Sequence, residues 1–380
     1  MPTETFLLYS HLAQYPMHLA AFTFLCDHFD VRGVILSGSP ASGELPPVHR
    51  QLGWGEVTGT PAFEVRRMPQ IDRAGKALWL RRQLKAIRPD AIWAQEEPTD
   101  YFLLQILAMY LFDRGPRIAT AVCENIFPRV PWSELLVRRI LWARLDALLA
   151  TAKTSIDGIR ATGMPASVPA ATLVAGALPP PEHVAPLPLP FPRSADDFIV
   201  AFAGRITELK GWKILLGALE SLPPRYKCIL AGDGDQVPQL ERRLGDPGLL
   251  GRACYLGLLP KDRLWNFYRA ADCLVLPSLT GPKWKEQFGG VLADGMALGI
   301  PLIGSDGGSI PEVIGPAGLI TREGDSSDLA SAIRRLCDEP GLRKRLAEAG
   351  RTRFLAEFDI PAYAGKIANA LRLRKKGAPA

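Results

Sequence analysis

The sequence lacks the cysteine pattern of a disulfide framework or a zinc site. Six cysteines are spread over 380 residues, with no C-x-x-C pair and no nearby histidine at a zinc-ligand spacing. They are Cys26, Cys123, Cys228, Cys254, Cys273 and Cys337. We therefore expect reduced core cysteines and a cytoplasmic protein.

A membrane-spanning segment and a secretory signal are also missing. The longest apolar run, YFLLQILAMYLF at residues 101–112, is well short of the ~20 residues that cross a bilayer. The opening MPTETFLLYS has an acid and no basic region, unlike a signal peptide. Peripheral contact with the anionic inner face of the membrane stays open, because the net charge is +6 and the last segment, PAYAGKIANALRLRKK, has a basic end. Those charges would equally stabilise a helix C-terminus.

Several catalytic signatures are absent as well. There is no G-x-S-x-G elbow, no H-E-x-x-H, no complete G-x-G-x-x-G and no Walker loop, which disfavours serine hydrolases, zinc proteases and dinucleotide oxidoreductases. Lys and Arg are dispersed among acids rather than clustered with aromatics, so we expect no nucleic-acid partner.

What is present is an alternation of β-branched runs with segments of helical periodicity. This pattern predicts parallel, doubly wound sheets, and the length favours two α/β domains. A run of prolines, ALPPPEHVAPLPLPFPR, is incompatible with helix or sheet and indicates a linker. The predicted parts are an N-terminal acceptor-binding domain at 1–178, a linker at 179–197, a C-terminal donor-binding domain at 198–358 and a terminal helix with a basic tail at 359–380, which packs back toward the N-terminal domain.

Ligands of parallel sheets bind beyond the carboxyl ends of the strands, and the loop after FIVAFA has residues suited to a diphosphate. GRITELKGW supplies Gly204, Arg205 and Lys210 just before a helix start. The alternative is that both cations form surface ion pairs, for example with Glu208.

The acidic turn DGD follows the strand YKCILAG. Two carboxylates so close could bind a metal ion. We favour a structural role instead, in which Asp235 caps the helix that follows and Asp233 sits in a tight glycine turn.

The stretch KEQFGGVLADGMALGIPLIGSD has the most informative arrangement. Glu286 precedes Gly289 and Gly290, where a helix begins and unpaired backbone N–H groups can meet an anion. Asp294 lies about one turn further along that helix. Two hydroxyl-accepting carboxylates around a diphosphate site describe a sugar nucleotide, although acids near a helix start are also favoured by the helix dipole alone. The glycine-rich SDGGSIPEVIG could close the same crevice.

These residues carry a resemblance. GRITELKGW, PSLTGPKWKEQFGGVLADGMALGIPLIGSDGGSIPEVIG and AGLITREGDSSDLASAI resemble the donor domain of retaining glycosyltransferases of family 4, the glycosyl transferases group 1. The likeness covers most of residues 198–358 and is looser in AQEEP and CENIFPRVPW. It implies the GT-B fold, two Rossmann-like domains facing each other across a cleft.

The resemblance also implies roles. Arg205 and Lys210 would hold the diphosphate of a UDP- or GDP-linked sugar, and Glu286 would bind hydroxyls of the transferred hexose. Asp294 would lie at the ribose. Backbone N–H groups from Phe288 to Gly290, with Gly204, would complete the donor site. The reaction would be retaining transfer to a hydroxyl of a sugar or lipid-linked sugar, in polysaccharide or glycoconjugate synthesis, with no cofactor and no metal.

The sequence departs from the family pattern in three places. Asp294 stands where a glutamate is usual, SHLAQYP replaces a glycine-rich first loop, and VCENI has Glu124 and Asn125 where a histidine is common. His11 and Glu124 are the candidates for the acceptor side. Alternatives are a GT-B epimerase or phosphorylase and, less favoured, a non-enzymatic basic binding module.

Overall fold

The structure is a computed structural model that describes residues 4–10, 16–37, 63–113, 115–128, 130–173 and 177–378. The chain forms two compact units, Met1–Gly176 with Ile360–Ala380, and Ala177–Asp359. The terminal helix α14 (Ile360–Ala370) therefore belongs to the first unit, where it packs on α1 (Pro16–His28).

The first unit is built on a fully parallel sheet with the order β3-β2-β1-β4-β5-β6-β7. The sequence predicts strands in this half at FLLYS, VRGVILSG, AIWAQ, RIATAV and ALLAT. The structure confirms them, whereas β3, β7 and the helices α1 and α6 have no counterpart in that prediction. The strands are β1 (Glu4–Ser10), β2 (Val31–Ser37), β3 (Phe63–Arg67), β4 (Ala91–Ala94), β5 (Arg117–Val122), β6 (Ala147–Ala150) and β7 (Ala170–Thr172). The helices between them are α1, α3 (Arg73–Ile87), α4 (Tyr101–Met109), α5 (Trp132–Trp142) and α6 (Lys153–Ala161).

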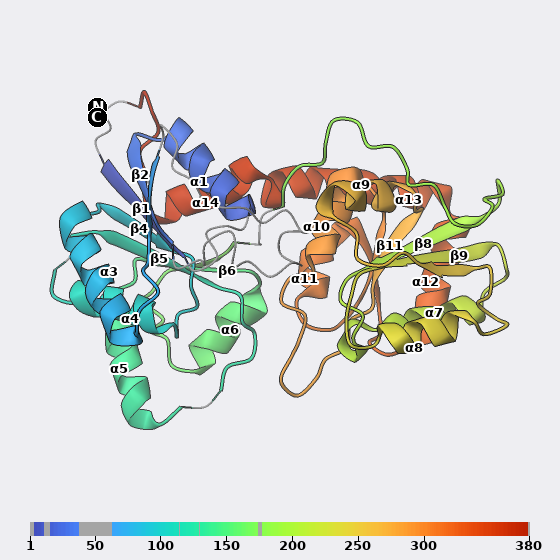
Figure 1. The fold of residues 1–380 in the computed structure, drawn as a ribbon, viewed down its shortest axis with the longest axis horizontal. Helices are drawn as coiled ribbons and strands as arrows, with labels where there is room; N and C mark the ends of the chain where they lie inside the picture. Colours follow the sequence, from blue (N-terminus) through green and yellow to red (C-terminus); the bar gives the residue numbers. More distant parts are fainter. Residues whose placement is uncertain are drawn as a thin grey trace. The chain divides into compact units, whose positions relative to one another are not determined.

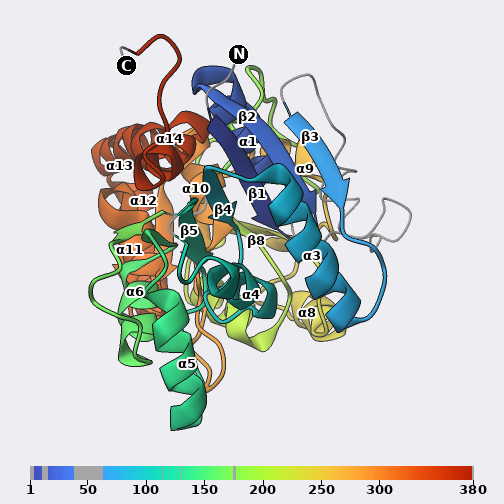
Figure 2. The same ribbon diagram turned by 90° about the vertical axis from the view of Figure 1, so that its left-hand side faces the viewer.

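Alternate side chains of this sheet enter two cores. Leu7 and Tyr9 of β1 join one buried cluster with α3, α4 and α6, while Phe6 stacks on Phe22 of α1 with ring centroids 5.1 Å apart. Gly33 lets α1 lie close to the sheet, because a Cβ there would meet Cys26 Sγ at 2.5 Å. Figure 2 shows α3, α4 and α5 in front of the sheet.

The second unit has a parallel sheet of order β10-β9-β8-β11-β12-β13. Figure 1 shows α7, α8 and α12 on one of its faces and α9, α10 and α13 on the other. The strands are β8 (Phe198–Ala203), β9 (Tyr226–Ala231), β10 (Ala253–Tyr255), β11 (Cys273–Leu276), β12 (Leu302–Ser305) and β13 (Gly318–Thr321). The helices are α7 (Trp212–Glu220), α8 (Val237–Leu244), α9 (Lys261–Arg269), α10 (Gly290–Leu298), α11 (Ile310–Ile314), α12 (Ser326–Asp338) and α13 (Pro340–Arg353), with short helical turns η2 (Glu208–Lys210), η3 (Gly315–Ala317) and η4 (Phe354–Phe358).

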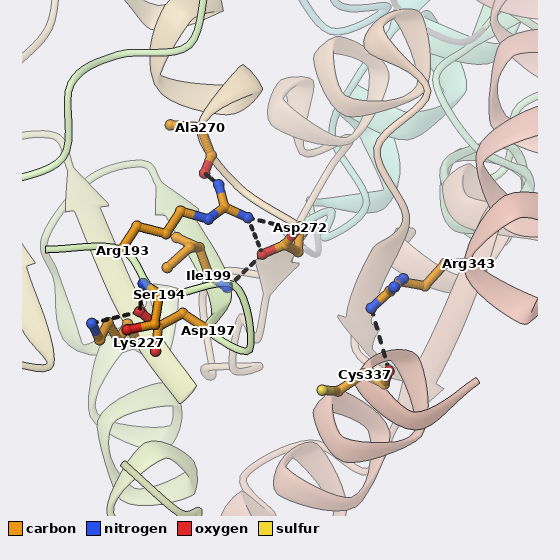
Figure 3. A network of polar contacts seen from close by, with 9 residues as sticks. All are labelled: Arg193, Ser194, Asp197, Ile199, Lys227, Ala270, Asp272, Cys337 and Arg343. Carbon is orange, nitrogen blue, oxygen red and sulfur yellow. Dashed lines mark hydrogen bonds and ion pairs between the residues drawn. The ribbon is translucent and has the colours of Figure 1, made fainter. Parts of the chain in front are cut away.

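The proline-rich segment contains no helix or strand, and it is bonded to the second unit. Leu187 N–H donates to the Asn266 carbonyl of α9 at 2.8 Å. Arg193 pairs with both carboxylate oxygens of Asp272 at 3.0 and 2.9 Å, and Asp272 accepts the Ile199 N–H at 2.7 Å (Figure 3). The segment is thus anchored where β8 and β11 begin.

In the described part of the chain, no helix combines the length and apolar character needed to span a bilayer.

Candidate functional site

The second sheet reverses its strand order between β8 and β11, because the chain runs outward through β9 and β10 and then returns. Ligands of open parallel sheets bind at such a point, beyond the carboxyl ends. The loops that leave β8 and β11 meet there, with Leu279 N–H donating to the Leu209 carbonyl at 2.8 Å. Gly211 (φ +71°) makes this approach possible, since a Cβ would lie 1.8 Å from the Pro277 carbonyl oxygen.

Lys210 and Glu286, predicted for one ligand, form a buried ion pair. Lys210 Nζ lies 2.6 Å from Glu286 Oε2, which also accepts the Ser278 hydroxyl at 2.8 Å. The lysine and glutamate side chains are 12% and 7% exposed. Lys210 Nζ also lies 4.8 Å from the centroid of the Trp284 ring, within the range of a cation–π contact. Such a pair is expensive to desolvate, which makes this edge the candidate site.

The glycine-rich loop after β12 fixes the Glu286 backbone. Ser309 donates both its N–H, at 3.0 Å, and its hydroxyl, at 2.9 Å, to the Glu286 carbonyl. Gly308 (φ +57°) permits the contact, because a Cβ there would lie 2.4 Å from the same carbonyl oxygen. This loop does close on the predicted site.

Gly289 and Gly290 begin α10 as predicted. Gly289 is its N-cap with φ +74°, and no side chain caps the helix. A Cβ at Gly289 would meet Leu276 Cδ2 at 2.4 Å. Gly290 is exposed, and Phe288 packs near Phe358, with 6.0 Å between the ring centroids. Uncapped N–H groups at this helix start suit an anion.

Asp294 has a partner that the sequence did not indicate. Both of its carboxylate oxygens lie 2.9 Å from Lys261 Nζ, and the Tyr268 hydroxyl donates to Oδ2 at 3.3 Å. Burial, together with Asp294, raises the pKa of Tyr268 well above its ordinary value, so the phenol stays a donor. Asp294 is 7% exposed.

Lys261 opens α9, just beyond the loop after β10, and its side chain is 32% exposed. Its ammonium lies 4.3 Å from the centroid of the Trp265 ring. The only sequence signal was its position after a strand at the ligand-binding edge. A second lysine–carboxylate pair therefore stands at this edge, with its cation closer to solvent than its acid.

Arg205 is exposed, and its guanidinium has no partner within the described ranges. It remains available for an anion. At Gly204 a Cβ would meet only Phe202 Cζ, at 3.9 Å, whereas at Gly232 it would lie 1.7 Å from the Gly204 carbonyl oxygen. The close approach of the loop after β9 to the loop after β8 thus depends on Gly232 more than on Gly204.

The predicted cap at Asp235 is wrong. The N-cap of α8 is Gln236, without a side-chain cap bond, and the helix begins at Val237. The Gln236 N–H instead donates to the Ile206 carbonyl at 3.0 Å, which holds this residue outside the helix. Asp233 Oδ1 accepts the neighbouring Gly234 N–H at 2.8 Å, as a turn residue should. Within the described residues no group of three or more His, Cys, Asp or Glu is placed to bind a metal ion.

At the corresponding edge of the first sheet, after β4 and β5, the prominent group is Glu97. Its Oε1 accepts the N–H groups of Cys123 at 2.7 Å and Glu124 at 3.1 Å. Burial outweighs these bonds and raises the pKa of Glu97 to about 7. Of the predicted acceptor-side residues, Glu124 is exposed beside it, and His11 lies outside the described residues. The motif AQEEP contained the signal for Glu97, but its burial could not be read from sequence.

Comparison with known proteins agrees with this geometry. Residues 190–353 match the family model described as glycosyl transferases group 1. The 2-deoxystreptamine glucosyltransferase of Streptomyces kanamyceticus is 28% identical over 172 residues, 44% of this chain and 43% of that protein. The lipopolysaccharide core biosynthesis glycosyltransferase LpsD of Rhizobium meliloti is 34% identical over 181 residues, 44% and 49% of the two chains. The match thus spans about half the length of these relatives or less.

Solved structures resemble the whole chain. Anabaena Alr3699/HepE in complex with UDP has a TM-score of 0.70 at 19% identity, covering 97% of this chain and all (100%) of that one. A glycosyltransferase from Rickettsia africae has a TM-score of 0.73 at 15% identity and covers 100% of both chains. The chain is therefore an α/β protein of the GT-B fold. Its similarity to the glycosyl transferases group 1 is carried by residues 190–353.

Proposed function

We propose that this protein is a retaining glycosyltransferase that moves a hexose from a UDP- or GDP-linked sugar to an acceptor hydroxyl. The observation that carries the proposal is the buried Lys210–Glu286 pair beside the uncapped start of α10. Its relatives include glucosyl and lipopolysaccharide core transferases, and HepE has been solved with UDP-glucose. They support polysaccharide or glycoconjugate synthesis as the setting.

In this proposal the glutamate and the cations have separate tasks. Glu286 accepts hydrogen bonds from hexose hydroxyls, and its contacts with Lys210 and the Ser278 hydroxyl hold its carboxylate in place. Lys210 has three N–H donors, so it can serve Glu286 and a phosphate together. Arg205 adds an exposed guanidinium at the same edge. As the bond from the sugar to phosphate breaks, these cations stabilise the charge that grows on the departing diphosphate.

The transfer is proposed to need neither a metal nor a protein nucleophile. The sugar–phosphate bond breaks while the acceptor oxygen bonds to the same face of the sugar, and the acceptor proton passes to the leaving phosphate. Charge stabilisation by Arg205 and Lys210 replaces the metal as the electrophilic group. Glu97, whose pKa is raised to about 7, is a candidate to hold the acceptor hydroxyl. The free cysteines suit a reducing, cytoplasmic location.

Donor binding is tested by thermal shift with UDP, GDP, ADP and TDP and their common sugar conjugates. A nucleotide at 100 times its Kd should add about 2.7 kcal/mol to the free energy of unfolding. Arg205→Ala and Lys210→Ala should each reduce the ligand-induced shift. Lys213→Ala is the matched control, because this lysine pairs with exposed Glu208.

Acceptor-dependent release of the nucleotide distinguishes transfer from epimerisation, which would change the donor without an acceptor. If no nucleotide shifts the melting temperature, the proposal is contradicted. If Lys210→Ala shows the same nucleotide-induced shift as the parent, the Lys210–Glu286 pair takes no part in donor binding.

A further inference from the structure

Helix α5 of the first unit exposes an apolar face that the core does not use. Trp132 is 78% exposed, Leu136 is 53% and Ile140 is 49%. These residues recur every four positions and so lie on one side of the helix. Trp142, near the opposite side, is buried in the core. Exposed apolar patches on a soluble unit usually mark an interaction surface.

The exposed apolar residues are concentrated in the layer formed by α3, α4 and α5. These helices contact in sequence and stand side by side in Figures 1 and 2. Phe112, just after α4, is 97% exposed and Leu78 of α3 is 51% exposed. Outside residues 71–140, the large apolar side chains found exposed in the described ranges are Leu250, Ile320 and Leu355.

The same layer carries an excess of positive charge. Helix α3 has five basic residues and no acid, and Arg88 follows it. Along the described chain, none of these six cations takes part in an ion pair. Arg81 and Lys85 are one turn apart, a like-charge spacing that destabilises a helix. The six cations of this layer are Arg73, Lys76, Arg81, Arg82, Lys85 and Arg88.

We propose that the α3–α5 layer docks on an anionic lipid bilayer. The apolar face of α5, with Trp132 at its start, enters the interface, and the α3 cations meet the lipid headgroups. Each basic residue near an anionic surface strengthens binding about fivefold. A second copy of this chain fits less well, because it would bring the same unpaired cations.

This surface replaces the basic C-terminal end as the membrane contact. Lys376 Nζ donates to the Cys26 carbonyl at 3.0 Å, and Arg374 donates to the Ala378 carbonyl at 2.9 Å. Those cations are used within their own unit. By contrast, α5 begins after β5, so Trp132 lies toward the carboxyl edge of the first sheet, the edge that carries Glu97.

The test is co-flotation of the full chain with vesicles of phosphatidylcholine mixed with phosphatidylglycerol, and with pure phosphatidylcholine as the comparison. We expect binding to the anionic vesicles that weakens with added salt. Trp132→Ser/Ile140→Ser should weaken binding at least about tenfold, as should Arg81→Glu/Arg82→Glu, which reverses two cations.

Matched controls lie in the second unit. Leu250→Ser/Leu355→Ser removes exposed apolar side chains, which are 69% and 64% exposed, and Lys344→Glu/Arg345→Glu reverses two adjacent exposed cations of α13. Both should bind like the parent. Absence of binding by the parent, equal binding to pure phosphatidylcholine, or equal losses in the controls would overturn the proposal. A concentration-dependent dimer that Trp132→Ser/Ile140→Ser abolishes, with no vesicle binding, would assign the face to a second copy.

Discussion

The two units have the same kind of parallel sheet, yet the carboxyl edges of those sheets differ in charge pairing. In the second unit the two predicted site acids are each paired with a lysine, Glu286 with Lys210 and Asp294 with Lys261. In the first, Glu97 accepts two backbone N–H groups and forms no ion pair with any described residue. The fold thus supplies equivalent places, and the side chains decide what each place can bind.

This difference in pairing matches two kinds of ligand. Lysines beside an uncapped helix start favour a diphosphate, and the acids hold those lysines in position. A carboxyl group that titrates near neutral pH favours a neutral hydroxyl, because it can accept or donate a hydrogen bond. The proposed function requires such a division, with the donor in the second unit and the acceptor in the first.

Lys210→Ala should have the largest effect on this comparison. It leaves Glu286 buried without its cation, a loss that typically lowers the free energy of unfolding by about 3 to 5 kcal/mol. Removing a group that stabilises the transition state costs about 10²–10³ in turnover. Denaturant titration and donor turnover measure the two losses.

Lys213→Ala is the control, because its exposed pair with Glu208 is worth about 1 kcal/mol or less. Lys210→Met/Glu286→Gln should recover part of the lost stability without recovering turnover, since no charge is then buried unpaired. Similar stability and turnover in Lys210→Ala and Lys213→Ala would show that the two edges do not differ as described.

Glu97 should make stability depend on pH in the opposite sense to an ordinary paired acid. Its pKa is raised from 4.5 to about 7 in the fold. Between these two pH values the folded state therefore holds a proton that the unfolded state has lost. The stabilisation is complete below about pH 4.5 and is lost as pH rises through 7. The loss is roughly 3 kcal/mol at most. Denaturant titrations across this range should show the slope in the parent and a reduced slope in Glu97→Gln.

Glu124→Gln is the control for this slope, since Glu124 is exposed, keeps its backbone N–H bond to Glu97 in the variant, and raises the pKa of Glu97 less than burial does. An unchanged slope in Glu97→Gln, or an equal reduction in Glu124→Gln, would contradict the assignment.

The sequence predicted the parts of the fold that depend on local pattern. The runs that became β8, β9 and β11 are buried almost throughout, so their apolar, β-branched composition was a sufficient signal. Helix α1 was missed because PMHLAAFTFLCDH is apolar nearly all round and shows no clear period.

The candidate site was predictable where topology alone determines it. Lys210 and Glu286 follow the two strands at the reversal of the second sheet, and the rule for parallel sheets brings such loops together. The contact of Asp294 with Lys261 depends on how α9 packs on α10, which no local pattern encodes. The prediction of a cap at Asp235 was wrong because a nonlocal hydrogen bond, from the Gln236 N–H to the Ile206 carbonyl, makes the helix begin one residue later.

Asp294→Glu should have the smallest effect, although it restores the residue usual in the resembling family. Asp294 is buried, and both of its oxygens are already 2.9 Å from Lys261 Nζ. A longer side chain must displace the ammonium or strain its own rotamer, at a cost of about 1 kcal/mol in stability. The donor KM should change by less than about tenfold, equivalent to 1.4 kcal/mol, because Lys261 keeps a carboxylate partner. Asp294→Asn is the informative contrast, since it leaves Lys261 without a countercharge and should raise the donor KM further. If Asp294→Glu instead improved the donor KM strongly, the ribose would be bound by the acid directly, and the lysine pairing at this edge would be a feature of the ligand-free state alone.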